Sequence, residues 1–342
     1  MKSYAVPGLV YMKNPLPLLR HALRFGKHYV QNSFRRDGWR AAAAPAISFE
    51  TTSVCNSRCV FCPNGAMERP RQKMSIDVFK KAVDQAVDMG VSHYDFFVTI
   101  GDPLLDPQLL ERARYVRSHA QIRDMGFNST LQWLHLFDLD EFFACGFTWV
   151  HVSTTLSGSE TYRNFFGVDK YDLMLQNLLM LLRENNRRGK PVIIEIGVKP
   201  TPEPREQIIS HPDFLLIQSL TDQNLAETVM HEDFLVCDWG GTVKLPDYLR
   251  PLPLWPRSHR PCYRLFEGVQ IFSNGKVGAC ACRDFEASSE LILGSIQEKT
   301  LPEMWNGEQI ARIRSDWRSG NKVPEICSKC RSYDPRAYRP NN

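Results

Sequence analysis

Between Ala46 and about residue 220, the sequence alternates short apolar runs with longer amphipathic runs. The short runs predict strands because they are rich in Val, Ile and aromatic residues, and the longer runs predict helices because their apolar residues recur every three or four positions. Six strands separated by helices predict a parallel sheet, either an open barrel or a doubly wound sheet. In both folds the loops after the carboxyl ends of the strands carry the chemistry. The predicted strands cover residues 46–53, 94–100, 125–128, 148–153, 192–198 and, more weakly, 214–219.

Helix signals support the same alternation. Ser75 is a residue type that caps helices, and Gly90 closes the amphipathic run that follows it. A further helix is predicted to start near Pro107, and another to cover residues 170–187.

Composition divides the chain into four regions. Residues 1–45 form a basic amphipathic extension, and residues 46–220 form the predicted sheet core. Residues 221–260 lack periodicity and indicate a connector, and residues 261–342 form a small α+β unit. We interpret the extension as a helix packed on the next domain, with contact to a membrane surface or an acidic partner as the alternative.

Composition also excludes several classes. The 342 residues are 43% hydrophobic, which suffices for one large core and a smaller one. The net charge of +4 does not indicate a nucleic-acid partner. No apolar run is long enough to span a bilayer, and Pro7 and Lys13 interrupt the N-terminal apolar patch, so we expect neither a transmembrane segment nor a signal peptide. Ten clustered cysteines are typical of metal binding in a reducing compartment, so we expect a cytoplasmic protein.

The most specific motif is a group of three cysteines, Cys55, Cys59 and Cys62, directly after the first predicted strand. Their C-x3-C-x2-C spacing suits a soft metal site on a loop. Structural zinc usually takes its four ligands as two pairs, which this group does not provide. A cubane [4Fe–4S] cluster bound by three cysteines leaves one iron open to a cofactor or substrate. The alternative is three unrelated loop cysteines.

The segment CNSRCVFC resembles the signature of the radical S-adenosylmethionine (radical SAM) superfamily. The resemblance implies a partial (β/α)6 TIM-like barrel in which SAM binds the open iron through its amino and carboxylate groups. It also implies that the reduced cluster cleaves SAM and that a 5′-deoxyadenosyl radical removes a hydrogen atom from the substrate. Phe61, between the second and third cysteines, matches an aromatic residue that the family often places beside the adenine.

Further segments extend the resemblance over roughly residues 46–220. TIGDPLLDP resembles the Gly-Gly-Glu region that holds the SAM amino group, which implies contacts from Gly101 and Asp102. FNST and VSTTLSG fall where the family has Thr-Asn-Gly and Ser-Ile-Asp-Gly, which implies contacts from Asn128 and, through the ribose, from Ser153. The sequence departs from the family pattern at Asp102, where Glu is usual, and at Thr155, where Asp is usual.

Two of the candidate SAM contacts have simpler interpretations. Asp102 has the alternative role of a carboxylate at a helix N-terminus. Lys199, just past the fifth predicted strand, is either a partner of the SAM carboxylate or an exposed lysine at a strand end.

A second set of four cysteines lies in the C-terminal unit: Cys262, Cys280, Cys327 and Cys330. Asn274-Gly275 predicts a hairpin with Cys280 on its second arm. Four thiolates indicate zinc or an iron–sulfur cluster. SNGKVGAC and LGSIQEKTLPEMWNG resemble the SPASM extension or its shortened twitch form, which implies one auxiliary [4Fe–4S] cluster on these cysteines. Cys282 is either a fifth candidate ligand or a small buried residue.

The remaining candidates stand alone. Cys145 ends a predicted helix and is expected in the core. Cys237 is a candidate hydrogen-atom donor, and Asp238 a candidate acceptor for a substrate hydroxyl or a base. Tyr162 and Arg163 either line the same cavity or belong to an amphipathic helix face.

These features favour a radical SAM enzyme of the oxidoreductase or epimerase type. We expect it to abstract hydrogen from a small polar substrate such as a sugar or aminocyclitol, leading to oxidation or epimerisation. A flavodoxin or ferredoxin is the expected electron donor. The alternatives are a maturase that modifies a peptide or protein, and a zinc-stapled binding protein without enzymatic activity.

Overall fold

The computed structural model describes residues 41–42, 45–96, 99–119, 121–224, 226–230, 235–257, 260–280 and 284–334. Its largest element is a nine-stranded sheet with the order β11-β10-β9-β1-β2-β3-β4-β5-β6. Every pairing from β9 through β1 to β6 is parallel, whereas β10 is antiparallel to both of its neighbours. The parallel strands of the core are β1 (Ala46–Phe49), β2 (His93–Phe96), β3 (Asp124–Ser129), β4 (Trp149–Thr154), β5 (Ile193–Val198) and β6 (Ala226–Met230).

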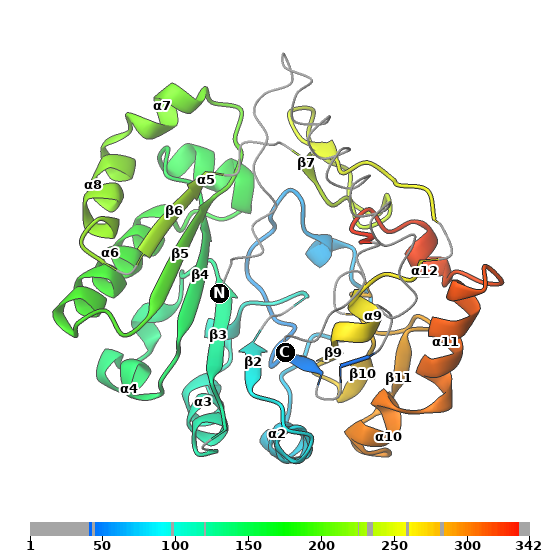
Figure 1. Cartoon of the computed structure of the whole chain (residues 1–342). Coiled ribbons are helices and arrows are strands. Elements are labelled where there is room, and N and C mark those ends of the chain that lie inside the picture. Colours follow the sequence, from blue (N-terminus) through cyan, green and yellow to red (C-terminus); the bar gives the residue numbers. More distant parts are fainter. Residues whose placement is uncertain are drawn as a thin grey trace.

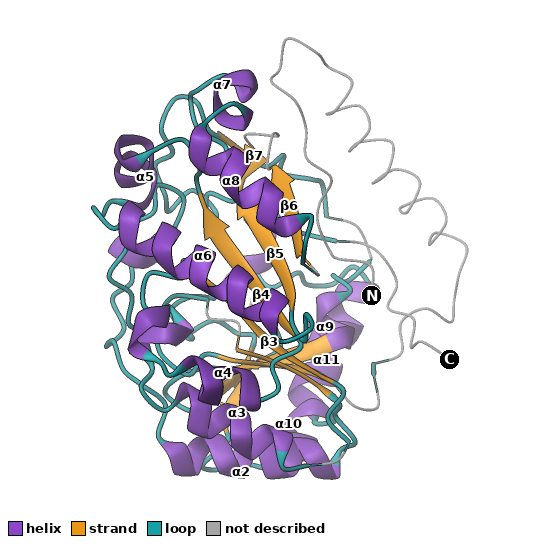
Figure 2. Cartoon of the chain, turned by 90° about the vertical axis from the view of Figure 1, so that its left-hand side faces the viewer, coloured by secondary structure: helices purple, strands orange, loops and turns teal. Residues whose placement is uncertain are grey.

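Helices cover one face of this curved sheet, as Figures 1 and 2 show. On β4 and β5 the side chains on the covered face, such as Val150, Val152 and Ile194, are fully buried. Successive strand residues point to opposite faces, so His151 and Glu195 lie on the other face, which we call the inner face. The result is the α/β fold with a partial parallel barrel that the sequence predicts.

The core helices follow the strands in order. They are α2 (Ile76–Asp88), α3 (Leu109–Arg117), α4 (Leu139–Ala144), α5 (Ser159–Phe166), α6 (Tyr171–Arg187), α7 (Arg205–Ile209) and α8 (Pro212–Thr221). Short 3₁₀ helices are η1 (Pro63–Gly65), η2 (Pro103–Leu105) and η3 (Leu134–Leu136). The predicted cap of α2 is confirmed, because Ser75 Oγ accepts from Val78 N at 3.2 Å.

The prediction of a strand at residues 214–219 is wrong, because these residues lie in α8. Pro212 occupies the first turn of this helix, and Phe214 and Ile217 are buried three positions apart, while Leu215 is 55% exposed. The continuous apolar run concealed the helical period. The sixth strand is instead β6, within the segment predicted to be a connector. Of the second predicted strand, residues 94–96 lie in β2, residues 97–98 fall outside the described residues, and Thr99 and Ile100 lie in a bend.

The C-terminal unit continues the main sheet, since β9 (Gly268–Ile271) pairs in parallel with β1. The predicted hairpin is confirmed: Asn274 and Gly275 join β9 to β10 (Lys276–Gly278), and Gly275 has a φ of +80°. Cys280 lies just beyond β10 rather than on it. The remaining elements are β7 (Leu235–Val236), β8 (Arg250–Pro251), α9 (Arg264–Glu267), β11 (Ile292–Ser295), α10 (Leu301–Trp305), α11 (Glu308–Arg318) and α12 (Glu325–Ser328).

Two sequence predictions fall outside the described residues. Of the basic extension at residues 1–45, only residues 41, 42 and 45 are described, and Cys282 is not described. Across the described ranges, no helix has both the length and the apolar character that crossing a membrane requires.

Candidate functional site

The three-cysteine loop follows β1 and is held against the end of α5. Arg58 N donates to Phe166 O at 2.8 Å, and Val60 N donates to Phe165 O at 3.0 Å. Gly167 permits this close approach, because its φ is +69° and a Cβ there would lie 2.8 Å from Arg58 Cβ. The backbone on both sides of the central cysteine is therefore fixed.

A buried glutamine, Gln132, forms hydrogen bonds that stabilise the three-cysteine loop. Gln132 Nε2 donates to Ser57 Oγ at 3.1 Å and to Tyr162 OH at 2.8 Å, and Gln132 Oε1 accepts from Asn56 Nδ2 at 2.8 Å. Tyr162 is fully buried and supports the loop, whereas Arg163 is exposed on α5. Sequence analysis missed Gln132, because it lies 75 residues beyond Ser57 and no motif marks it.

The three thiols lie close enough to influence one another. Burial raises the pKa of Cys55 to about 12, and the Asp102 carboxylate adds to this effect. Burial also raises the pKa of Cys59, helped by the Cys62 and Cys55 thiols. The pKa of Cys62 rises by burial despite the nearby positive charge of Arg71. Three half-buried thiols within electrostatic reach of one another fit an iron–sulfur cluster, because bound iron would supply the positive charge that stabilises thiolates.

Gly101 brings the end of β2 against the start of this loop. Its φ is +129°, and a Cβ there would come within 2.2 Å of Thr52 O, so only glycine fits. The next residue, Asp102, donates from its backbone N to Val54 O at 3.0 Å. The segment after β2 is therefore part of the wall on which the cysteine loop rests.

The Asp102 carboxylate is already occupied by the chain's own donors. It accepts from Ser129 Oγ at 2.8 Å, from Thr130 Oγ1 at 2.9 Å, and from Thr130 N and Leu104 N at 3.1 Å. Burial raises its pKa against these hydrogen bonds. Asp102 thus caps η2, which is the alternative role considered above, and its contact with SAM stays a prediction.

The other predicted SAM contacts lie around the same loop. Asn128 on β3 and Ser153 on β4 are half-buried on the inner face, and neither side chain has a hydrogen-bond partner among the described residues. The Phe61 ring packs against Phe165 with centroids 5.5 Å apart. No observation tests their contact with SAM, so these assignments stay predictions.

Several buried hydroxyls at the carboxyl ends of β4 and β5 lack partners. Within the described chain, Thr155 Oγ1, Ser157 Oγ and Thr201 Oγ1 make no hydrogen bond. A buried hydroxyl without a partner costs free energy, so these hydroxyls in two neighbouring loops are available to bind a polar ligand. These loops stand at the sheet edge where the cysteine loop also lies, so their hydroxyls fit a polar cofactor bound beside that loop.

A titratable pair occupies the inner face beneath these loops. His151 on β4 stands opposite Glu195 on β5, and His151 Nδ1 donates to Glu195 Oε1 at 2.7 Å. Burial lowers the pKa of His151, and the positive charge of Lys199 lowers it further. The same Lys199 charge lowers the pKa of Cys59, so the lysine is within electrostatic reach of both His151 and the cysteine loop. Sequence analysis singled out Lys199 but missed the His–Glu pair.

The second cysteine group is only partly assembled by the described residues. Burial raises the pKa of Cys262 to about 12, with a contribution from Cys330. Burial raises the pKa of Cys327 too, and both Cys262 and Cys330 add to it. These three thiols therefore lie together, and Cys280, half-buried after β10, is adjacent to a segment outside the described residues.

The two isolated cysteines differ in their surroundings. Cys145 is buried at the end of α4 and donates from Sγ to Leu110 O at 3.4 Å, as expected for a core residue. Cys237 is half-buried, and its Sγ accepts from Trp239 N at 3.2 Å. Its role as a hydrogen-atom donor stays a prediction.

The turn at Cys237–Trp239 touches both cysteine groups. Trp239 Nε1 donates to Phe61 O at 2.9 Å, and its ring meets Phe285 edge-on at 5.7 Å. Asp238 forms an ion pair with Arg331, which donates from Nε to both carboxylate oxygens at 2.8–2.9 Å. This pairing makes Asp238 a link to the segment after Cys330, rather than the free acceptor or base that the sequence suggested.

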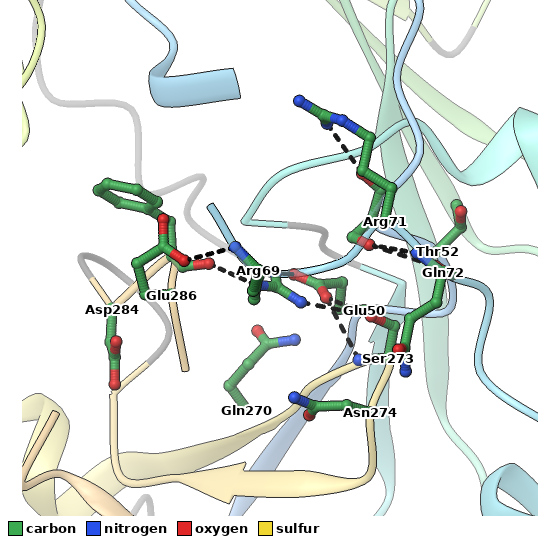
Figure 3. Close-up of polar contacts among 12 residues, drawn as sticks. Glu50, Thr52, Arg69, Arg71, Gln72, Gln270, Ser273, Asn274, Asp284 and Glu286 are labelled. Carbon is green, nitrogen blue, oxygen red and sulfur yellow. Dashed lines mark hydrogen bonds and ion pairs between the residues drawn. The ribbon is translucent and has the colours of Figure 1, made fainter. Parts of the chain in front are cut away.

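A buried ion pair joins the two cysteine-bearing regions, as Figure 3 shows. Arg69 donates to Glu50 at 2.7 Å and to Phe285 O at 2.5 Å, and Glu50 also accepts from Ser273 Oγ at 2.8 Å. Glu286 accepts from the backbone N of Arg69 at 2.9 Å. The loop after Cys62 is thus tied to the hairpin tip and to the loop after Cys280.

Comparison with known families agrees with this geometry. The model of the radical SAM superfamily matches residues 49–210, and the model of SPASM, an iron–sulfur cluster-binding domain, matches residues 262–331. The chain belongs to the radical SAM superfamily. Its cofactors are therefore a [4Fe–4S] cluster and SAM, and the SPASM domain implies auxiliary iron–sulfur binding.

Relatives of this radical SAM enzyme are distant. The tungsten-containing aldehyde ferredoxin oxidoreductase cofactor-modifying protein of Pyrococcus furiosus is 22% identical over 319 residues, covering 83% of this chain and 86% of the relative. BtrN in complex with AdoMet and 2-DOIA has a TM-score of 0.54 at 16% identity, covering 84% of this chain and 92% of BtrN. Streptococcus suis SuiB bound to precursor peptide SuiA has a TM-score of 0.57 at 15% identity, covering 96% of this chain and 81% of SuiB. At these identities the two structures establish the fold alone.

Proposed function

We propose that this radical SAM enzyme binds a small polar substrate, such as a sugar or an aminocyclitol, against the inner face of β3, β4 and β5. When bound, the cluster and SAM supply a 5′-deoxyadenosyl radical that takes a carbon-bound hydrogen atom from the substrate. Oxidation would be completed if the substrate radical passed one electron to the auxiliary cluster and lost a proton. Epimerisation would be completed if a thiol such as that of Cys237 returned a hydrogen atom to the same carbon.

The observation that supports this proposal is the set of polar side chains on the inner face. The imidazole of His151 and the carboxylate of Glu195 stand there on neighbouring strands, beside Asn128 and Ser153, which are predicted to contact SAM. A polyhydroxylated molecule both donates and accepts hydrogen bonds, so it matches such a wall. A peptide would instead use main-chain hydrogen bonds and apolar pockets.

We assign the cofactors to residues as follows. Cys55, Cys59 and Cys62 hold the SAM-binding cluster, and the unpartnered hydroxyls of Thr155 and Thr201 hydrogen-bond SAM. One auxiliary cluster is held by four cysteines: Cys262, Cys280, Cys327 and Cys330. Solved relatives of similar fold carry different molecules, 2-DOIA on BtrN and the peptide SuiA on SuiB, so the substrate class rests on the inner face of this chain.

One experiment tests the proposal in two stages. The chain is reconstituted with iron and sulfide without oxygen, and SAM and dithionite are added. We expect about eight irons per chain from two cubanes, and 5′-deoxyadenosine that disappears when Cys55, Cys59 and Cys62 are replaced by Ala. Cys145→Ala is the matched control, because this buried cysteine lies away from the site. Zinc in place of iron would contradict the assignment.

The second stage identifies the substrate. Deuterated sugars, aminocyclitols and peptides are screened for deuterium transfer into 5′-deoxyadenosine. Transfer from a polyhydroxylated compound supports the proposal. Transfer from peptides alone would instead establish the maturase.

A further inference from the structure

Arg257 lies against the cysteines of the SPASM domain. It belongs to the segment between β8 and Cys262, and its Nε donates to Cys327 O at 2.8 Å. A second guanidinium nitrogen donates to Cys330 O. Its guanidinium also stacks over the Tyr333 ring at 4.5 Å. A single side chain thus donates hydrogen bonds to the backbone carbonyls of both cysteines in the C-x2-C pair.

The charge of Arg257 has no carboxylate partner among the described residues. Its third hydrogen bond goes to Trp255 O, so every acceptor it uses is a neutral carbonyl. By contrast, Arg69 pairs with Glu50, and Arg331 pairs with Asp238. Removing a cation from water without an anion is costly, so an anion bound beside this half-buried guanidinium would stabilise it.

The nearby thiols would supply that anion as iron-bound thiolates. Burial lowers the pKa of Arg257, whereas Cys330, Cys327 and Cys262 raise it again, which places all three thiols within electrostatic reach of the guanidinium. The other charges at these thiols are Arg264 beside Cys262 and Glu290 beside Cys327, and they have opposite signs. Arg257 is therefore a charge at this site that has no carboxylate partner within the described part of the chain.

We propose that Arg257 is the counter-cation of the auxiliary cluster and raises its reduction potential. The inference rests on the proposed function, because it requires a cluster on the SPASM cysteines. Reduction adds one negative charge to a thiolate-ligated cluster, so a nearby buried cation stabilises the reduced form more than the oxidised form. Its hydrogen bonds to the carbonyls of two ligand residues also fix their orientation.

The test measures the potential of the auxiliary cluster alone. The Cys55→Ala, Cys59→Ala, Cys62→Ala chain lacks the SAM-binding cluster, and it is reconstituted without oxygen with Arg257 intact or replaced by Gln, Met or Lys. The midpoint potential is read from the electron paramagnetic resonance signal during a redox titration. We expect Gln and Met to shift the midpoint to more negative values, and Lys to stay close to the parent because it keeps the charge.

Arg314 provides a matched control. Its guanidinium is also half-buried, lies 4.5 Å over the Trp305 ring and donates from Nε to Leu265 O at 2.8 Å. Burial alone lowers its pKa to about 10, and no cysteine contributes. Arg314→Gln should therefore leave the midpoint unchanged.

The outcomes separate this inference from the proposed function. Equal midpoints for the parent, Arg257→Gln and Arg257→Met would overturn the role of Arg257. A midpoint for Arg257→Lys as low as that of the neutral variants would do the same, because charge would not be the cause. If the neutral variants hold no iron, recovery of iron by Arg257→Lys supports the counter-cation, and failure to recover it contradicts it. A parent chain that binds no iron would instead refute the auxiliary site itself.

Discussion

His151 has the geometry of an oriented hydrogen-bond acceptor. His151 Nδ1 donates to Glu195 Oε1 at 2.7 Å. In the neutral ring the other nitrogen, Nε2, is therefore a hydrogen-bond acceptor. Its side chain is 17% exposed, so a ligand on the inner face can reach it. The paired arrangement of an imidazole and an orienting carboxylate is one that enzymes use to bind or deprotonate hydroxyl groups.

Replacing His151 with Gln should weaken substrate turnover without stopping SAM cleavage. Loss of one substrate hydrogen bond costs about 1–2 kcal/mol, which is about a 5- to 30-fold loss of kcat/KM. Formation of 5′-deoxyadenosine in the absence of substrate should stay unchanged. His93→Gln is the control, because His93 is exposed at the start of β2. Unchanged kcat/KM in the His151 variant would place the substrate elsewhere.

The same histidine should make stability depend on pH. Because burial lowers the pKa of His151, the unfolded chain binds its proton at a higher pH than the folded chain. The free energy of unfolding should therefore decrease as the pH falls through about 6.5, the ordinary histidine value. Urea denaturation of the cluster-free chain between pH 8 and 5 measures this loss. The His151→Gln chain should lose less stability over that range, and identical losses would show that His151 does not titrate there.

Only some of the residues that form the candidate site could be predicted from the sequence. The cysteines and Gly101 belong to local motifs whose spacing is visible in one stretch. Gln132, Glu195 and Arg257 act through partners far away in the chain, so their roles depend on a topology that no local pattern encodes. Asp102 shows the reverse case, because its motif position suggested a ligand contact while the fold supplies it with hydrogen-bond donors from Ser129 at the end of β3 and from Thr130 just after it.

At the scale of elements, the tight contact between β2 and the cysteine loop is the feature most sensitive to substitution. Gly101→Ala would place a Cβ 2.2 Å from Thr52 O in a left-handed conformation. Such backbone strain costs about 1–3 kcal/mol before any displacement of the loop. We expect reduced stability and reduced iron binding at the three-cysteine site, measured by urea denaturation and iron analysis of the reconstituted chain.

Gly65 supplies the control within the same loop region. A Cβ on Gly65 would meet nothing within 4 Å, so Gly65→Ala should keep both stability and iron. If both alanine variants behave like the parent chain, the contact between β2 and the loop is not what fixes the cysteines.

The elements themselves were largely predictable where periodicity and turn chemistry agreed. Ser75 and the Asn274-Gly275 turn carry local signals strong enough to fix α2 and the hairpin. The strand prediction for residues 214–219 failed because Leu215 and Leu216 are exposed apolar side chains that mask the helical period. β6 was missed because its five residues are half-buried or exposed, so they show no alternation of buried and exposed positions.

At the scale of the whole molecule, the Glu50–Arg69 pair holds the two cysteine-bearing regions together. Its side chains are 0% and 8% exposed. Arg69→Met leaves a buried carboxylate unpaired and should lower the free energy of unfolding by about 3–5 kcal/mol. The double variant Glu50→Met, Arg69→Met should recover much of this loss, because an apolar pair needs no compensation. Urea denaturation of the four chains measures the cycle, and additive losses would show that the two side chains do not interact.

The parallel pairing of β1 with β9 has a consequence for how this protein can be divided. A chain cut before Gly268 would leave the backbone N–H and C=O groups along one edge of β1 unpaired, immediately beside the three-cysteine loop. An unpaired strand edge of this kind can form backbone hydrogen bonds with strands of other chains, which leads to aggregation. The SPASM domain therefore pairs with what would otherwise be an exposed edge strand of the barrel. Exchanging this domain between relatives would succeed only if the incoming strand paired with β1 in the same register.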